Sequence, residues 1–286
     1  MRDISTETAK IGIFDSGIGG LSILREIRSC INDIPLSYIA DQAHVPYGDR
    51  MASEILLFSR SISRFLIKNG AKMIVVACNT ASAAALQQLR HDFPDVPFVG
   101  MEPAVKPAAQ TTQSKVVGIL ATPATFQGKM YHTLVEKFAS NVRILNSTLP
   151  GMVQIIENGK MDDKKAYKIV EKAVLPMVEE GADTIVLGCT HFPFILPLIR
   201  NIAGPKIEVI DPAPAIAKRT AFLVKENKKL FEPTTNKKGE IFFATSGDPE
   251  KFQAMIRNLL GISSEPKHLR WAKEDIAYSE ETNHDE

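Results

Sequence analysis

The sequence predicts an α/β protein built on parallel sheets, and three observations support this fold class. Short β-branched runs each end in a turn and continue as a helical pattern, as in "KIGIFDSGIGGLSILREIR" at residues 10–28. The strand runs are apolar almost throughout, which is typical of strands buried on both faces of a sheet. The chain has 286 residues, 44% of them hydrophobic, enough for two modest domains. We therefore expect two similar α/β domains with mainly parallel sheets covered by helices.

Three further units of the same kind follow along the chain, each predicting a strand, a turn and an amphipathic helix. They are "KMIVVACNTASAAALQQLR" (72–90), "KVVGILATPATFQGKMYHTLVEKF" (115–138) and "DTIVLGCTHFPFILPLIR" (183–200). The second and fourth units align so that Cys78 and Cys189 coincide at an offset of 111 positions. The first and third align from Gly12 to Gly118 at an offset of 106. Two nearly equal offsets predict two similar half-molecules.

The join between the halves falls in "DFPDVPFVGMEPAVKP", which contains four prolines and a glycine. After "KIEVIDPAPAIAKRT" the chain predicts a helix, a polar stretch, a strand "IFFATSG" and a helix "PEKFQAMIRNLLG". This last segment has no counterpart in the second half, so it should pack back onto the first. We predict one domain from residues 1–99 plus 212–286 and another from residues 100–211. The acidic tail at 274–286 is expected to be disordered.

Composition excludes several classes of function. Lys and Arg number 34 against 33 Asp and Glu, and no stretch gathers basic residues into a stripe, so nucleic acid is not expected as a primary partner. The polar start "MRDISTETAK" predicts no signal peptide, and we expect a cytoplasmic protein. No apolar run reaches the roughly 20 residues that a membrane-spanning helix needs.

The three cysteines, Cys30, Cys78 and Cys189, are widely spaced, which does not suit a disulfide framework. No C-x-x-C or H-x-x-x-H pattern accompanies Cys189, so we expect no metal site. Cys30 lies inside a helix pattern, where a packing role is expected.

Ligands of open parallel sheets bind outside the carboxyl ends of the strands. Four loops lie at such ends: "DSGIGG" (15–20), "CNTAS" (78–82), "ATPAT" (121–125) and "GCTH" (188–191). Two of them carry a cysteine. A thiol at a helix N-terminus faces unpaired N–H groups and the positive end of the helix dipole, so we expect the pKa of both thiols to be lowered.

Each of these features also has a purely structural interpretation. A cysteine that ends a buried strand is often a small core residue. The "DSGIGG" loop could be a tight turn or a phosphate cradle, although it lacks the lysine of a P-loop. Asp15 could cap a helix, or it could face a substrate ammonium or a thiol. His191 could cap the first helical turn, or it could contact its own Cys189.

Two thiols on opposite sides of a ligand could remove a proton from one face of a carbon and return a proton to the other, which inverts a stereocentre. Such chemistry needs neither a metal nor an organic cofactor if the site stabilises the carbanion-like transition state. Small polar donors are available in the same loops: Ser16, Asn79, Thr80 and Thr190. The residues alone lead to the hypothesis of a two-thiol acid/base enzyme, provided that the cysteines face each other.

A set of motifs occurs here in a characteristic order: "IGIFDSGIGGLS", "DQAHVPYGDR", "VVACNTASA", "VLGCTHFP", "VIDPAPAIA" and "FFATSGDPEKF". In this respect the chain resembles the glutamate racemases from about Lys10 to Gly261. Related aspartate racemases look more like "CNTAH" and "GCTE". The resemblance implies a cofactor-independent racemase with two α/β domains and the active site between them. It would interconvert L- and D-glutamate and supply D-glutamate for bacterial peptidoglycan.

The resemblance also implies roles for individual residues. Cys78 would act on the D-isomer and Cys189 on the L-isomer, with Asp15 and His191 assisting the adjacent thiols. The positions that match the substrate-contacting residues of the family are Asp15, Ser16, Tyr47, Gly48, Asn79, Thr80, Thr190 and His191.

The chain departs from the family pattern at two places. Phe192 stands where the family commonly has Tyr, and "LNSTLPGMVQIIENG" lacks a cysteine-proline pairing, so no role is assigned to Glu157.

Two alternatives stay open. One is a related racemase for another substrate such as aspartate, against which His191 argues because it replaces the acidic residue of "GCTE". The other is a protein without catalysis that binds an amino acid between its lobes or inhibits a partner such as DNA gyrase. Two intact cysteine motifs argue against a pure binder. We expect a small-molecule substrate, no cofactor and a homodimer.

Overall fold

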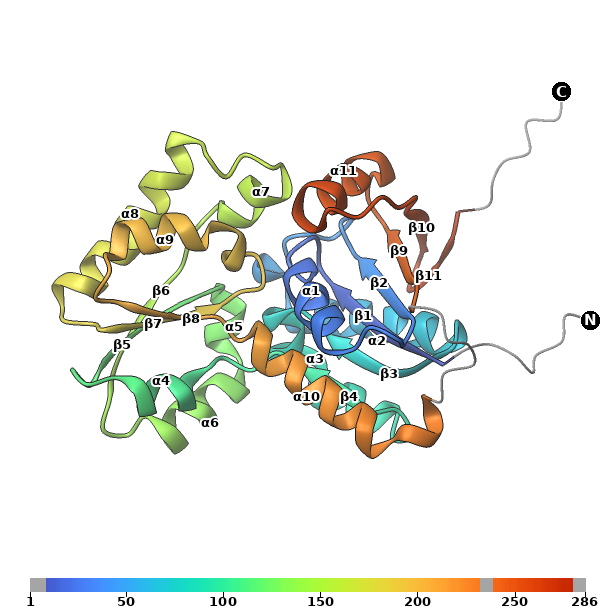
Figure 1. Ribbon diagram of the computed structural model, residues 1–286, viewed down its shortest axis with the longest axis horizontal. Coiled ribbons are helices and arrows are strands. Elements are labelled where there is room, and N and C mark those ends of the chain that lie inside the picture. Colours follow the sequence, from blue (N-terminus) through green and yellow to red (C-terminus); the bar gives the residue numbers. More distant parts are fainter. Residues whose placement is uncertain (1–8, 232–238, 280–286) are drawn as a thin grey trace, which may run out of the picture.

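The computed structural model describes residues 9–231 and 239–279, and its strands form two sheets (Figure 1). In chain order the strands are β1 (Lys10–Asp15), β2 (Leu36–Ala40), β3 (Ala71–Val76), β4 (Phe98–Gly100), β5 (Val116–Ala121), β6 (Arg143–Ser147), β7 (Thr184–Gly188), β8 (Glu208–Ile210), β9 (Ile241–Thr245), β10 (Lys267–Ala272) and β11 (Asp275–Tyr278). The first sheet has the order β11-β10-β9-β2-β1-β3-β4 and is parallel except for the β10–β11 pair. The second has the order β6-β5-β7-β8 and is parallel throughout.

Helices cover both faces of each sheet. They are α1 (Leu21–Cys30), α2 (Ala52–Lys68), α3 (Asn79–Asp92), α4 (Val105–Thr111), α5 (Pro123–Gln127), α6 (Lys129–Phe138), α7 (Met152–Glu157), α8 (Lys164–Glu179), α9 (Leu196–Ala203), α10 (Ala213–Glu226) and α11 (Pro249–Leu260), with 3-10 helices η1 (Tyr47–Asp49), η2 (Phe192–Ile195) and η3 (Lys228–Leu230). On the first sheet α1 and α11 pack on one face, and α2 and α3 pack on the other. On the second sheet α8 and α9 lie opposite α4 and α6 (Figure 1). The predicted α/β class with helix-covered, mainly parallel sheets is confirmed.

All four predicted strand-helix units form. The unit that contains Cys189 differs in detail, because β7 leads first into the short η2 and only then into α9. Pro193 and Pro197 each stand in the first turn of one of these two helices, where the missing N–H of proline is tolerated. The two prolines therefore divide what the pattern suggests is one helix.

The chain passes between the sheets twice, from β4 to α4 and from β8 to α10. As predicted for "IFFATSG", β9 returns to the first sheet and pairs with β2. We propose that residues 1–99 plus 212–286 and residues 100–211 are the two domains, since β1 to β4 and β9 to β11 share one sheet and β5 to β8 the other.

The acidic tail differs from the prediction. Residues 275–278 of the expected disordered stretch form β11, which pairs antiparallel with β10. The reason is the alternation along the strand: Ile276 is buried against the core below α2, while Asp275 and Ala277 are exposed. Residues 280–286 lie outside the described residues, as do 1–8 and the 232–238 part of the polar stretch.

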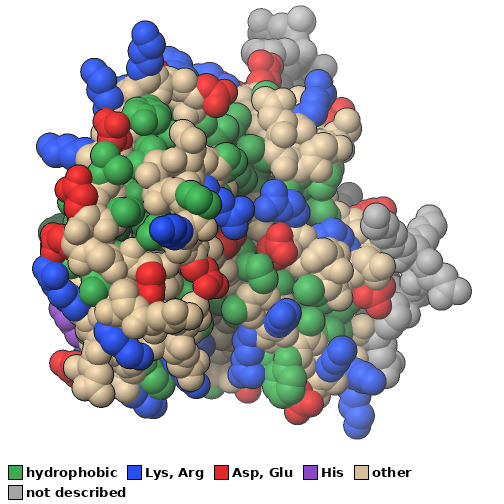
Figure 2. All heavy atoms as spheres, turned by 60° about the vertical axis from the view of Figure 1, so that its left-hand side comes forward, with side chains coloured by type: hydrophobic (Ala, Val, Ile, Leu, Met, Phe, Trp, Pro, Cys, Tyr) green, Lys and Arg blue, Asp and Glu red, His purple; other side chains and the backbone are tan. Residues whose placement is uncertain are grey.

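The surface carries mixed charge. On the face in Figure 2, Lys and Arg side chains are interspersed with Asp, Glu and hydrophobic side chains. In the described part of the chain, none of the helices combines the length and the apolar character that crossing a bilayer requires.

Candidate active site

The predicted strand-end loops of the two sheets meet. Thr80 from the loop after β3 and Thr122 from the loop after β5 approach with their Oγ1 atoms 2.9 Å apart. On the opposite side, the Thr190 hydroxyl after β7 donates to Asp15 Oδ2 at 3.4 Å, and Ser22 Oγ donates to the Thr190 carbonyl at 3.2 Å. The carboxyl ends of β1, β3, β5 and β7 thus surround one region.

Cys78 is the N-cap residue of α3. Its Sγ accepts the Ala81 N–H at 3.4 Å, and its thiol approaches Ser16 Oγ at 4.0 Å. Its side chain is 5% exposed. Asp15, at the end of β1, is fully buried and accepts the Gly20 N–H at 2.7 Å. The first sheet therefore contributes a thiol and a carboxyl group.

The expected lowering of the Cys78 pKa is wrong. Burial, and next the charge of Asp15, raise the pKa of the Cys78 thiol well above its ordinary value, although the Ala81 N–H acts in the opposite direction. Burial also raises the pKa of Asp15, against the lowering effect of the His191 charge. The charge of Cys189 is a further, smaller influence that raises the pKa of Cys78.

Cys189 follows β7 directly and is 6% exposed. The Nδ1 atom of His191 lies 3.8 Å from its Sγ, and the Nε2 atom of His191 lies 2.6 Å from Glu157 Oε1. Burial alone would lower the pKa of His191, but its hydrogen bonds to Cys189 and Glu157 raise that pKa well above the ordinary value. An imidazolium beside a thiol supports negative charge on the sulfur.

Glu157 is the residue that the sequence analysis left without a role. It ends α7, and its Oε1 accepts both His191 and the Ile18 N–H at 2.7 Å, while its Oε2 accepts Gln42 Nε2 at 2.9 Å. Burial would raise the pKa of Glu157, but these hydrogen bonds, with that of His191 first, lower it. Glu157 and His191 form a buried ion pair, and the Glu157 carboxylate also accepts hydrogen bonds from loops of the first sheet.

The Asn79 side chain is a candidate contact for a polar ligand. Its side chain is buried, and neither Oδ1 nor Nδ2 has a hydrogen-bond partner among the described residues. Buried amides in folded proteins nearly always have partners. Ser16, Thr80 and Thr190, which the sequence analysis grouped with Asn79, are buried in the same loops.

Tyr47 and Gly48 form part of η1. The Tyr47 hydroxyl donates to Asp41 Oδ2 at 2.7 Å, and a Cβ at Gly48 would stand 2.9 Å from the Thr122 Cβ. Only glycine lets the two loops approach this closely. Burial, and next the charge of Asp41, raise the pKa of Tyr47, and the charges of Cys78 and Asp15 act in the same direction.

A cavity of about 170 Å³ adjoins this region. Gly48, Thr122, Leu149 and Phe192 are among its lining residues, and neither Cys78 nor Cys189 is. Within the described residues, no group of three or more His, Cys, Asp or Glu side chains is arranged to hold a metal ion.

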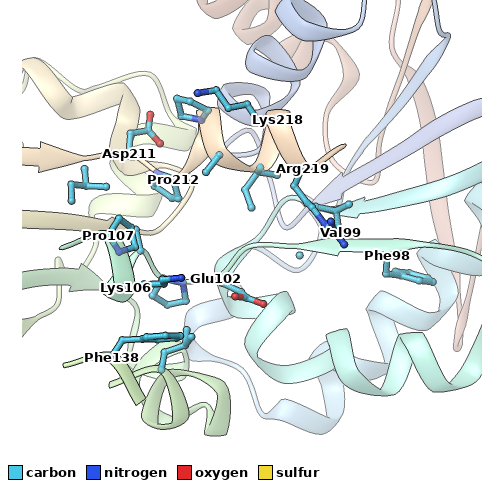
Figure 3. A pocket seen from close by; sticks show the side chains of 18 of the residues that line it. Phe98, Val99, Glu102, Lys106, Pro107, Phe138, Asp211, Pro212, Lys218 and Arg219 are labelled. Carbon is cyan, nitrogen blue, oxygen red and sulfur yellow. The ribbon is translucent and has the colours of Figure 1, made fainter. Parts of the chain in front are cut away.

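A larger cavity of about 750 Å³ lies where the chain passes between the sheets (Figure 3). Lys218 and Arg219 of α10 line it from one side, and Glu102, Lys106 and Phe138 line it from the other. It contains no cysteine or histidine, so it is separate from the paired thiols. Cys30 lies on the exposed surface of α1, so the packing role expected for it is wrong.

Two helix-covered, mainly parallel sheets, whose strand-end loops meet and carry a buried cysteine after β3 and another after β7, define the chain as a two-sheet α/β protein. The chain belongs to the Asp/Glu/Hydantoin racemase family, whose model matches residues 17–220. It is therefore a racemase, an enzyme of the isomerase class.

Individual relatives agree with this family. Over 257 residues the chain is 47% identical to a glutamate racemase of Roseiflexus sp., covering 90% of this chain and 94% of the relative. A glutamate racemase structure from Bacillus anthracis matches with a TM-score of 0.82 at 27% identity, covering 94% of this chain and all of the other. The Francisella tularensis glutamate racemase in complex with D-glutamate matches with a TM-score of 0.79 at 29% identity, covering 94% of this chain and 98% of that one.

Proposed function

We propose that this chain interconverts L- and D-glutamate without a cofactor, by acid/base chemistry at Cys78 and Cys189. The observation that carries the proposal is the pairing of each buried thiol with its own ionisable neighbour. His191 contacts Cys189 at 3.8 Å, and the charge of Asp15 acts on Cys78. The glutamate racemase names of the relatives, and the D-glutamate bound to the Francisella tularensis protein, support the choice of substrate.

In the direction from L to D, the Cys189 thiolate takes the proton from Cα while the Cys78 thiol delivers its proton to the opposite face. The products are D-glutamate, a Cys189 thiol and a Cys78 thiolate. The reverse reaction returns each proton and restores the starting thiols. The His191 imidazolium balances the charge on Cys189 before transfer. Asp15, whose pKa is raised by burial, is the carboxyl group that assists Cys78.

Substrate binding would use the small polar groups around the thiols. The unpartnered Asn79 amide can both donate to and accept from a bound amino acid. The hydroxyl groups of Ser16, Thr80 and Thr190 supply further donors for carboxylates. Backbone groups of Tyr47 and Gly48 would complete the contacts, since the Tyr47 hydroxyl is already donated to Asp41.

The setting of this activity is part of the same proposal. The product D-glutamate would serve bacterial peptidoglycan synthesis, and hence cell-wall formation and cell shape, and the reaction would take place in the cytoplasm. Glutamate would be the small-molecule partner. The homodimer stays a prediction, which light scattering of the purified chain would measure.

Circular dichroism provides the direct test. Incubated with the purified chain and no added cofactor, L-glutamate should lose its signal as the racemic mixture forms, while L-aspartate should keep its signal. Loss of the L-aspartate signal alone would identify the related aspartate activity. If both signals persisted in the presence of folded protein, the proposed catalysis would be wrong and the binding alternative would stand.

A further inference from the structure

Hydrogen bonds connect the turn that follows β9 to side chains of the candidate active site. Thr245, the last residue of β9, is fully buried, and its Oγ1 donates to Gln42 Oε1 at 2.7 Å. The same Oγ1 accepts the Gly247 N–H at 3.0 Å. A threonine hydroxyl has a single hydrogen. Because the Gly247 N–H occupies the oxygen as an acceptor, the hydrogen is available for Gln42.

This arrangement fixes the orientation of the Gln42 amide. Its oxygen faces the Thr245 hydroxyl, so its NH₂ group faces Glu157 Oε2 at 2.9 Å. The turn fits closely around the side chain, since a Cβ at Gly247 would stand 2.7 Å from the Gln42 Cβ. Thr245 thereby determines which end of the amide meets the carboxylate.

The hydrogen bonds continue across the gap between the sheets. Gln42 and Thr245 belong to the first sheet and its loops, whereas Glu157 and His191 belong to the second. With Gln42 on Oε2, the Oε1 atom of Glu157 is directed at His191 Nε2, 2.6 Å away. His191 in turn contacts Cys189. Four side chains thus connect the end of β9 to one of the two thiols.

We propose that Thr245 and Gln42 are positioning residues that act through Glu157 on His191, and thereby on proton transfer at Cys189 and not at Cys78. The inference rests on the proposed function, because it assigns the effect to one of the two proton carriers. The neighbours of Cys78, Asp15 and Ser16, belong to its own sheet, and the hydrogen bond that joins Asp15 to the second sheet comes from Thr190 and not from Glu157.

Isotope effects distinguish this role from simple bracing of the fold. In Thr245→Val and Gln42→Met, kcat for L-glutamate should fall by about 3- to 10-fold, the size of one hydrogen-bond contribution. The primary deuterium isotope effect with α-deuterated L-glutamate should rise, because Cys189 removes that deuteron. The effect with α-deuterated D-glutamate should not rise. Thr245→Ser, which keeps the hydroxyl, should restore the wild-type values.

The matched control is Thr220→Val, which removes another fully buried threonine hydroxyl, bonded to the Ile216 carbonyl in α10. It should leave both isotope effects unchanged. A double variant, Thr245→Val with Gln42→Met, should be no slower than the slower single variant, because both act on the same carboxylate.

The outcomes separate the two proposals. If the wild-type chain does not racemise glutamate, the proposed function fails before any variant is compared. If the wild type is active but Gln42→Met and Thr245→Val slow both directions with unchanged isotope effects, or leave both unchanged, the positioning role is wrong. Gln42 lies on a partly exposed loop, so its variant decides the question if Thr245→Val does not fold.

Discussion

The two halves of the site hold the same chemical group in opposite electrostatic surroundings. Cys78 caps a helix but lies beside the Asp15 carboxyl, and burial and that charge raise its pKa. Cys189 has no long helix behind it, only η2, but it contacts a histidine that Glu157 keeps charged. The comparison teaches that a short-range ionisable neighbour and burial together outweigh the position of a thiol at a helix end.

The different surroundings of the two thiols determine which groups carry a proton before substrate binds. A thiol at Cys78 and an imidazolium at His191 are both favoured near neutral pH, because the pKa of each group is raised well above its ordinary value. In this state the Cys78 thiol carries the proton that it donates to Cα. In the proposed mechanism it is the form that accepts L-glutamate.

The largest expected effect comes from removing either thiol. Cys78→Ala and Cys189→Ala should each lower racemisation in both directions by about 10³-fold or more, since each isomer needs one thiol as base and the other as acid. Cys30→Ala should keep the wild-type rate because that thiol lies on the exposed surface. Circular dichroism with each isomer measures the rates.

Labelling from D₂O checks the same point in the intact enzyme. D-glutamate formed from L-glutamate should carry solvent deuterium at Cα, while the remaining L-glutamate stays nearly unlabelled early in the reaction. Equal early labelling of substrate and product would mean that a single base acts on both faces of Cα. The assignment of one proton carrier to each half of the site would then be wrong.

The next largest effect comes from replacing the ionisable neighbour of each thiol, and it differs between the two halves of the site. His191→Asn and Asp15→Asn should each lower kcat by about 10²-fold with a smaller change in KM, because both groups act mainly in the transition state. The isotope effect should rise with α-deuterated L-glutamate in His191→Asn and with α-deuterated D-glutamate in Asp15→Asn. A variant that changes KM alone would mark its residue as a binding group.

A smaller effect concerns stability and pH. The lowered pKa of Glu157 stabilises the fold above its ordinary value of 4.5, and this contribution is lost as pH falls through the folded pKa. The raised pKa of His191 stabilises the fold fully below 6.5, and this contribution is lost as pH rises through the folded pKa. Both contributions are present between these values.

Glu157→Gln should therefore lower the free energy of unfolding by about 3 kcal/mol between pH 4.5 and 6.5. The difference from wild type should shrink at more acid and more alkaline pH. Urea unfolding across this range measures it. A difference that does not depend on pH would show that the two side chains stabilise the fold by packing and not as an ion pair.

For reagents that remove metals or block carbonyl cofactors, we expect no effect on the rate of racemisation. Dialysis against EDTA and treatment with carbonyl reagents should leave the rate unchanged, while thiol alkylation abolishes it, because the chemistry is assigned to the two cysteines. If EDTA inactivated the enzyme and a divalent metal restored the rate, the reaction would need a metal ion in addition to the two thiols, and the cofactor-independent mechanism would be wrong.

Local patterns in the sequence predict much of this molecule. The strands β3 and β7 end within two positions of Cys78 and Cys189, and the duplication of the units points to their equivalence. The pKa of Cys78 could not be predicted, because it depends on burial among loops that come together only in the folded chain. For a similar reason β11 was missed: its pairing partner β10 is apparent only once the sheet is assembled.

Glu157 was missed for a related reason. It stands 139 positions from Ile18 and 34 from His191, and it ends a short helix that carries no distinctive spacing. The resemblance drew attention to the stretch that contains Glu157, but its departure from the family pattern left the residue without a role. Its significance depends on three partners from separate segments.

Cys30 gives the molecule an internal reference for access to its site. Its thiol is exposed on α1, whereas Cys78 and Cys189 are almost fully buried. A thiol reagent should therefore modify one cysteine quickly and two slowly, and the loss of activity should follow the slow phase. Bound glutamate should protect the slow pair and leave the fast thiol untouched. Because the thiolate is the reactive form and the pKa of Cys78 is raised, the ratio of the two rates compares access to the site between samples that are measured at the same pH.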